Sequence, residues 1–440
     1  MIHPRRLLER TSADRVLLRS SAIVFTGEVT ARLLGFLFSV AAARLLTPSG
    51  YGQIAYALAA VAIVTVLTNN APQGLGRFLA RHHGDAPTQA TYTTNWLIVI
   101  GLMLATSLVL VIPAATWAGL GGAMTAGLIA NLLGTVAFQT YREAQKGFGR
   151  FWATSFFWIL ANSLQLVAIV IAAMLGFRSP ALFLTIYGLS SVVALGLMSI
   201  KAPAALRFSR RLVAWRQVAA IARFVWPVIL TGIFYTVWLG ADLILLRHLL
   251  PHAPIGNYAA ARTLILGLSL PLSAINFALG PRMARMAESA VRPYILNLVL
   301  LAAAIVVPLS AGAILVGQPL LALTFGDRYA VASDVFLILV LGQACFALCG
   351  VLQAVWIWGL SRPGIDPVST GSGMVVTIAL GLSLIPHAGL RGAALAYAAG
   401  AAAQLLVLAV FTGWAIYAGA RPRLGPVREL ILELDQVAKA

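Results

Sequence analysis

Charged side chains are scarce in this chain of 440 residues, where Asp, Glu, Lys and Arg make up only 10% of the composition. Soluble domains carry about 25% charged residues. The shortage therefore excludes an ordinary soluble protein. Acidic residues are the scarcest charged type, with 13 against 31 basic ones, so the formal net charge is +18.

Cysteine is nearly absent as well. Cys345 and Cys349 are the only two, and they stand four positions apart in an apolar run. A metal or redox site would need His or acidic partners nearby, and this part of the sequence has none. We interpret both cysteines as small core residues, and we expect no metal site and no cofactor.

Several catalytic motifs are missing too. The chain has no GxxxxGK[ST] run, which excludes ATP hydrolysis by that route. Its six histidines form no HExxH motif, and the predicted external loops lack the paired carboxylates that a membrane glycosidase needs. The sequence therefore predicts a protein that is not an enzyme, and an integral membrane enzyme is kept as an alternative.

Long apolar runs dominate the sequence, in which 60% of the residues are hydrophobic. A helix of about 20 apolar residues is long enough to cross a hydrocarbon core of ~30 Å. The runs predict an all-α, polytopic membrane protein with about 12 transmembrane helices. The predicted spans are residues 20–46, 51–79, 93–117, 119–145, 152–175, 180–201, 217–250, 255–281, 292–316, 333–358, 366–386 and 391–418.

One stretch of the sequence occurs twice, half a chain apart. Residues 44–81 and 247–285 both read as the end of an apolar helix, a turn with Pro and Gly, and a second apolar helix that ends in basic residues. Gly52 of the first copy matches Gly256 of the second. Transporters built from two related bundles contain repeats of this kind. We therefore predict two related six-helix bundles.

The predicted domains follow from this repeat and from the charge runs. They are a cytoplasmic interfacial segment (1–19), an N-terminal six-helix bundle (20–201), a basic cytoplasmic linker (202–216), a C-terminal six-helix bundle (217–418) and a cytoplasmic tail (419–440).

Basic residues are distributed unevenly among the loops. If the N-terminus is cytoplasmic, that side holds 24 of the 31 Lys and Arg residues, and the opposite side holds five. Cytoplasmic loops carry the excess of Lys and Arg, so we predict the inner membrane as the location, with both termini in the cytoplasm. The basic run from Lys201 to Arg223 suits contact with anionic lipids, and we expect no nucleic acid partner.

Four ionisable residues lie inside the predicted spans. Glu28 and Arg32 share a helix face on the first span, whereas Asp242 and Arg262 lie on the seventh and eighth. Burial in lipid costs about 2.5 to 3.5 kcal/mol for each, so we expect them to face the bundle interior or a wet cavity. They either act on substrate and coupling ion or form structural pairs, and the sequence leaves both open. Polar residues that either line a substrate path or satisfy freed backbone groups are Asn69, Asn70, Gln73 and Tyr258.

Five segments carry a family resemblance. They are ARLLTPSGYGQIAYA (43–57), KGFGRF (146–151), ADLILLRHLLPHAPIGNYAAA (241–261), FGDRY (325–329) and GLRGAALA (389–396). In this order and spacing they resemble the polysaccharide flippases (Wzx-type) of the multidrug/oligosaccharidyl-lipid/polysaccharide exporter superfamily. The resemblance implies two six-helix bundles around a central cavity that opens alternately to each side, with undecaprenyl-diphosphate-linked sugars as cargo.

By the same resemblance, Arg32 and Arg262 are substrate-binding residues, and Glu28 and Asp242 are coupling or structural acids. Physical chemistry independently favours a cationic cavity, because a diphosphate cannot cross hydrocarbon unpaired and arginine binds it in a bidentate fork. Expected partners are the lipid-linked glycan, membrane lipids, a polysaccharide polymerase and glycosyltransferases, and the protein is expected to be a monomer. The alternatives are a multidrug or cation antiporter of the same superfamily and a lipid II flippase.

Overall fold

The computed structural model describes residues 26–72, 74–82, 84–199, 207–250, 255–269, 288–360, 362 and 364–417, and the regular elements in these ranges are all helices. The all-α prediction is confirmed there. A first helix covers residues 26–45. The other long helices are α2 (Pro48–Ala60), α3 (Ala62–Asn70), α4 (Leu75–Arg81), α5 (Ala86–Trp117), α6 (Gly122–Gly147), α7 (Phe151–Met174), α8 (Pro180–Ser199), α9 (Trp215–Leu249), α10 (Ile255–Ile265), α12 (Glu288–Phe325), α13 (Ser333–Ala354) and α14 (Ile365–Tyr417). The predicted segment 1–19 and the tail 419–440 lie outside the described residues.

Fewer helices meet the length and composition needed to span a membrane than the twelve spans predicted from the sequence. Among the described residues, eight helices are long and apolar enough to cross a membrane, or nine if the bent pair α2 and α3 forms one span. Two predicted spans are missing from this number because 20–46 and 255–281 both extend into residues that are not described. The full count of twelve stays a prediction.

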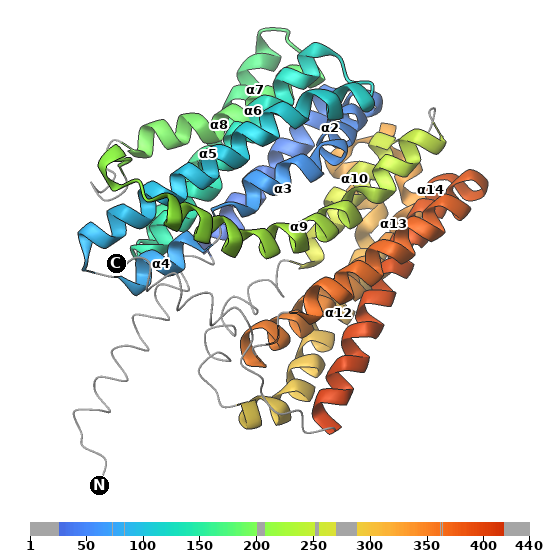
Figure 1. Ribbon diagram of the computed structural model, residues 1–440. Coiled ribbons are helices and arrows are strands. Elements are labelled where there is room, and N and C mark those ends of the chain that lie inside the picture. The colour runs from blue at the N-terminus through green and yellow to red at the C-terminus, as the bar shows by residue number, and fades with distance from the viewer. Residues whose placement is uncertain are drawn as a thin grey trace.

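Another part of the difference is α14, which joins two predicted spans in one element. Its 53 residues would measure about 80 Å as a straight helix, far more than a ~30 Å hydrocarbon core. The chain instead turns back at Gly389, whose φ of 56° and ψ of −129° are not helical. Figure 1 shows the two arms side by side, in orange and red. A Cβ added to Gly400 would lie only 2.7 Å from the carbonyl oxygen of Gly373, so the arms are closely packed.

The predicted second span, 51–79, consists of more than one helix. α2 and α3 meet at an angle of 58°, and Val61 between them has a φ of −100° and a ψ of 4°. Local hydrogen bonds accompany the bend, since the hydroxyl of Thr65 donates to the carbonyl oxygen of Ala62 at 2.7 Å. A second break lies at Pro72, because α3 ends at Asn70 and α4 begins at Leu75.

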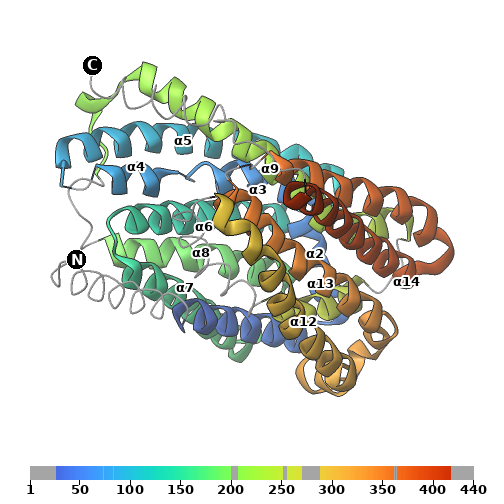
Figure 2. The same ribbon diagram turned by 90° about the horizontal axis from the view of Figure 1, so that it is seen from below.

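The helices form two groups. In Figure 1 the blue to green helices α2–α8 occupy the upper left, and the yellow to red helices α12–α14 occupy the lower right. Figure 2 shows the same division from below. Within the first group α6 and α8 approach closely, because a Cβ added to Gly134 would lie 2.1 Å from the carbonyl oxygen of Gly188. The exact bundle boundaries stay a prediction.

Large apolar side chains point outward from these helices. Val109, Met174 and Leu315 are between 70% and 82% exposed. Monomeric soluble proteins rarely expose broad apolar surface, whereas lipid tails cover such side chains. The outer surface is therefore that of a protein embedded in a bilayer.

The two copies of the repeat touch each other at equivalent residues. α2 and α10 pack together at Gly52 and Gly256, where a Cβ added to Gly52 would lie 2.7 Å from the backbone nitrogen of Gly256. Equivalent residues of two copies meet only near the axis that relates the copies. This contact suits a pair of bundles related by a two-fold axis, and superposition of the two halves stays a prediction.

The matching arginines of the repeat, Arg44 and Arg247, each contact a helix from the other half of the chain. Arg44 donates from Nε to the carbonyl oxygen of Thr324 at 2.7 Å, and its Nη2 donates to Leu323. These carbonyls end α12, where a positive charge is stabilising. Arg247, at the end of α9, lies over the ring of Tyr56, with 5.8 Å between its Cζ and the ring centroid. The arginines thus tie the two halves of the chain together.

We expect Gly256→Ala to lower the melting temperature of the purified protein, with a destabilisation of about 1 to 3 kcal/mol. The added Cβ would lie 1.8 Å from the carbonyl oxygen of Pro48, so α2 and α10 must separate. Gly312→Ala in α12 is the matched control, because a Cβ there meets nothing within 4 Å. Equal melting temperatures for Gly256→Ala and the parent would show that the close contact is dispensable.

Candidate functional site

Asp242 and Arg262 form a buried network between α9 and α10. Nη1 of Arg262 donates to Oδ1 of Asp242 at 2.7 Å and to the carbonyl oxygen of Leu239 at 2.8 Å. The hydroxyl of Tyr258 donates to Oδ2 of Asp242 at 2.7 Å, and the backbone N–H of Leu243 donates to Oδ1 at 2.8 Å. Both carboxylate oxygens therefore have partners. Tyr258, which the sequence suggested as a cavity-lining residue, is buried behind Asp242 instead.

Part of the Arg262 guanidinium remains available. Both of its hydrogen bonds use Nη1, and its other N–H groups have no partner within the described part of the chain. The guanidinium also lies over the ring of Tyr397, 5.0 Å from the centroid, and the side chain is 12% exposed. Arg262 is thus held firmly on one edge, while the other edge can meet an anion.

Glu28 and Arg32 form a second, more open pair. They are one helical turn apart on the helix over residues 26–45, and Nη2 of Arg32 donates to Oε1 of Glu28 at 2.6 Å. The predicted common helix face is confirmed. The side chains are 36% exposed for Arg32 and 25% exposed for Glu28. Arg32 also lies over the ring of Trp158, 5.9 Å from its centroid. The guanidinium of Arg32 is therefore more accessible than that of Arg262.

Tyr235 on α9 feels the charge of one arginine from each pair. Its phenol lies within electrostatic range of Arg262, Asp366 and Arg32. The two predicted arginines, far apart in the sequence, therefore approach one region of the fold. Asp366, near the start of α14, was not predicted as a site residue; Nε2 of Gln353 donates to its Oδ1.

The predicted polar residues at the end of the second span have separate surroundings. Asn69 lines a cavity and accepts a hydrogen bond from Nε2 of Gln139 on α6. Asn70 is buried and packs against α9, since a Cβ added to Gly232 would lie 2.2 Å from its Nδ2. Gln73 lies outside the described residues.

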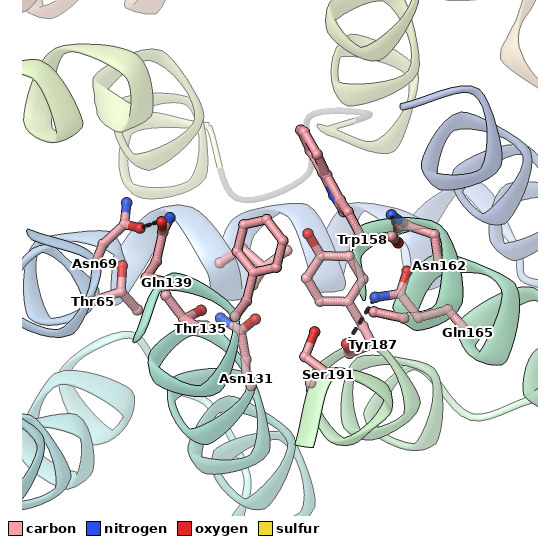
Figure 3. A pocket seen from close by; sticks show the side chains of 15 residues that line it. Thr65, Asn69, Asn131, Thr135, Gln139, Trp158, Asn162, Gln165, Tyr187 and Ser191 are labelled. Atoms are coloured by element: carbon pink, nitrogen blue, oxygen red, sulfur yellow. Dashed lines mark hydrogen bonds between the residues drawn. The ribbon is translucent and has the colours of Figure 1, made fainter. Parts of the chain in front are cut away.

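The cavity beside Asn69 has a volume of about 330 Å³ and lies among α2, α3, α6, α7 and α8. We call it the amide pocket. Figure 3 shows its polar and aromatic side chains converging from α3, α6, α7 and α8. The labelled residues are Thr65, Asn69, Asn131, Thr135, Gln139, Trp158, Asn162, Gln165, Tyr187 and Ser191. Its lining includes no charged side chain.

Sequence reasoning did not find the amide pocket. Its residues are single polar positions on four different helices, and each one alone is ordinary in a membrane helix that packs against others. The only signal was Asn69, which was predicted as cavity lining.

A family model described as "Polysaccharide biosynthesis protein" matches residues 41–334, which is more than half of the chain. No curated protein sequence matches the chain.

Solved structures of transporters resemble this fold. An inward-facing conformation of a multidrug resistance MATE family transporter of the MOP superfamily matches with a TM-score of 0.74 at 15% identity, over 88% of this chain and 95% of that one. A MOP superfamily transporter from Pyrococcus furiosus, described as having a binding pocket of reverse polarity, matches with a TM-score of 0.66 at 15% identity, over 91% and 95%. The lipid II flippase MurJ in an inward closed conformation matches with a TM-score of 0.60 at 12% identity, over 95% and 97%. At these identities the likeness shows the fold, which is that of multi-pass membrane proteins.

Proposed function

Because the chain belongs to the polysaccharide biosynthesis protein family and has the fold of MOP superfamily transporters, we propose that it flips an undecaprenyl-diphosphate-linked oligosaccharide across the cytoplasmic membrane by alternating access. Surface polysaccharide assembly requires such a step, because a lipid carrier cannot bring a sugar and a diphosphate through hydrocarbon unaided. The lipid-linked glycan is the cargo, and the polymerase and glycosyltransferases of the same assembly are its partners.

The observation that carries this proposal is a pair of arginines on intramembrane helices that both lie within electrostatic range of Tyr235. Arg32 is partly exposed, and Arg262 keeps one edge of its guanidinium open. Arginine binds phosphate oxygens through parallel N–H groups, and such charge-assisted bonds are stronger than neutral ones. Two arginines supply the positive charge that a diphosphate needs at membrane depth.

The membrane potential supplies a driving force without ATP. An inside-negative potential favours outward movement of an anion by about 2.3 kcal/mol per charge per 100 mV, so a doubly charged headgroup gains roughly 4 to 5 kcal/mol. This gain requires that the arginines stay behind when the cargo moves. Glu28 holds Arg32 on their shared helix, and Asp242 on α9 holds Arg262 of α10.

A cation antiporter is the second candidate, and Asp366 favours it. This carboxylate lies within electrostatic range of Tyr235 in the same region, and its described side-chain partner is the neutral Gln353. An acid without an arginine bonded to it suits a cationic substrate or a coupling proton. A lipid II flippase differs from the main proposal only in the sugar that the same carrier lipid bears.

Reconstituted protein tests the proposal directly. Undecaprenyl diphosphate bearing a labelled neutral disaccharide is placed in proteoliposomes, and its exposure to an impermeant sugar-oxidising reagent is followed with time. We expect protein-dependent transbilayer movement that accelerates with a potential favouring anion exit. Proton-driven movement of a cationic dye, with no movement of the glycolipid, would favour the antiporter.

The proposed topology has its own test. With Cys345 and Cys349 replaced by serine, Ser209→Cys in the linker is expected to resist an impermeant thiol reagent in intact cells and to react after permeabilisation. Ser179→Cys, in the exposed predicted external turn before α8, is the matched control and is expected to react in intact cells. Strong labelling of Ser209→Cys from outside would contradict cytoplasmic termini.

A further inference from the structure

The amide pocket holds hydrogen-bonding groups that the protein itself does not use. Gln165 is only 5% exposed. Its Nε2 donates to the carbonyl oxygen of Tyr187 at 3.1 Å, whereas its Oε1 has no hydrogen-bond partner among the described residues. Figure 3 shows this side chain between those of Asn162 and Tyr187. A buried acceptor without a partner is unfavourable, so the site is arranged for a donor that comes from elsewhere.

A second amide faces the same pocket. Asn131 on α6 is buried at 8% exposure and lines the pocket. Other amides of the wall are already fixed, since Asn162 donates to the carbonyl oxygen of Trp158 at 2.9 Å and Gln139 donates to Asn69. The free donors and acceptors therefore sit in a rigid frame, which favours binding because little ordering remains to be done.

The chemistry of the wall points to an uncharged, polyhydroxylated ligand. The lining offers amides and hydroxyls but no Lys, Arg, Asp or Glu. Three aromatic side chains, Phe138, Trp158 and Tyr187, present ring surface to the same space. A sugar ring combines hydroxyls that bond to amides with apolar C–H faces that pack on aromatic rings. A volume of about 330 Å³ lies at the lower end of the usual range for ligand pockets, about 300 to 1,000 Å³, and suits a short unit rather than a whole glycan.

The pocket also adjoins one of the two arginines. Arg32 lies over Trp158, which is part of the pocket wall. The same helix approaches the wall a turn later, where a Cβ added to Gly35 would lie 3.3 Å from Oδ1 of Asn162. A group attached to a diphosphate on Arg32 is therefore next to the pocket.

We propose that the amide pocket binds a neutral sugar of the cargo, the unit nearest to the diphosphate, and so selects the glycan. This rests on the proposed function, since it needs a diphosphate-linked sugar as cargo. An acidic sugar is disfavoured there, because its carboxylate would lose hydration in a wall with no cation to pair with it.

Binding by the purified full chain in nanodiscs tests the site. Two probes are compared: undecaprenyl diphosphate alone and the same lipid bearing a neutral disaccharide. The parent protein is expected to bind the sugar-bearing lipid about tenfold more tightly, the effect of one to two good hydrogen bonds. Gln165→Leu is expected to remove this advantage and to leave the affinity for the bare lipid unchanged.

Matched variants keep the result interpretable. Gln145→Leu is the control, because Gln145 is also buried with an unpartnered Oε1 but does not line the pocket. It is expected to keep the preference for the sugar. Ser191→Ala removes a single half-buried hydroxyl from the lining and replaces Gln165→Leu in the test if that variant does not fold. Its preference for the sugar-bearing lipid over the bare lipid is expected to fall about threefold.

The failures of the two proposals are distinguishable. Equal affinity of the parent for both lipids, or an undiminished preference in Gln165→Leu and Ser191→Ala, would overturn the sugar site and leave the diphosphate cargo standing. A change in melting temperature with unchanged binding would assign these polar groups to ordered water alone and would also overturn the site. Binding of neither lipid would overturn the cargo proposal together with the sugar site.

Discussion

Asp242→Asn is expected to destabilise the folded protein by about 3 to 5 kcal/mol, because it leaves the charge of Arg262 buried and uncompensated. The carboxylate is buried and accepts hydrogen bonds from Arg262, Tyr258 and the backbone of Leu243. An asparagine amide keeps one acceptor oxygen and places two donors beside groups that already donate. Thermal unfolding of the purified protein, together with its abundance in the membrane, checks this result.

Glu28→Gln is the matched control, since it makes the same change from acid to amide in the more exposed pair. With side chains 25% and 36% exposed, Glu28 and Arg32 are solvated enough that losing the ion pair is expected to cost no more than about 1 kcal/mol. The double variant Asp242→Asn with Arg262→Gln removes both buried charges. It is expected to recover much of the stability that Asp242→Asn loses.

Unchanged stability with lost activity in Asp242→Asn would assign Asp242 a different role. If Asp242→Asn unfolded at the parent temperature and was abundant but inactive, Asp242 would be a coupling acid rather than a structural partner. The four hydrogen bonds of the network favour the structural role, which the sequence had left open.

Helix positions were predictable because a long apolar run has few structural options in a bilayer. Backbone groups in hydrocarbon must bond within the segment, so about 20 apolar residues form a helix. The bend at Val61 was not predictable in this way. The surrounding sequence, YALAAVAIVTV (56–66), contains neither Gly nor Pro, and the bend arises from how α2 packs on α10 while α3 packs beside α9.

The sequence predicted contacts in the candidate site only between residues that are close together in the chain. Glu28 and Arg32 are four residues apart, so helical geometry alone brings them together. The bond between Asp242 and Arg262 depends on how two helices pack, which spacing does not determine. Asp366 was missed because it stands beside Pro367 at the start of a predicted span, where an acid is ordinary. The amide pocket requires four helices to be placed before its residues become neighbours.

Arg32→Ala is expected to reduce glycolipid movement in proteoliposomes by roughly 10- to 100-fold, the effect of losing strong charge-assisted hydrogen bonds to a phosphate. Protein abundance and melting temperature are expected to stay near those of the parent, because Arg32 is partly exposed and its one acidic partner, Glu28, can be solvated. Arg178→Ala, in the exposed turn before α8, is the matched control and is expected to transport normally.

Arg32→Lys separates charge from geometry in the same assay. Lysine keeps the positive charge but loses the planar fork, so transport is expected to be partly restored rather than complete. A purely structural pairing predicts instead that Arg32→Ala and Glu28→Gln have the same small effect, since each breaks the same ion pair. An antiporter for cations predicts a third pattern, in which loss of Asp366 stops transport and loss of Arg32 is tolerated. Normal glycolipid movement by Arg32→Ala at normal abundance would therefore show that this helix holds no diphosphate site.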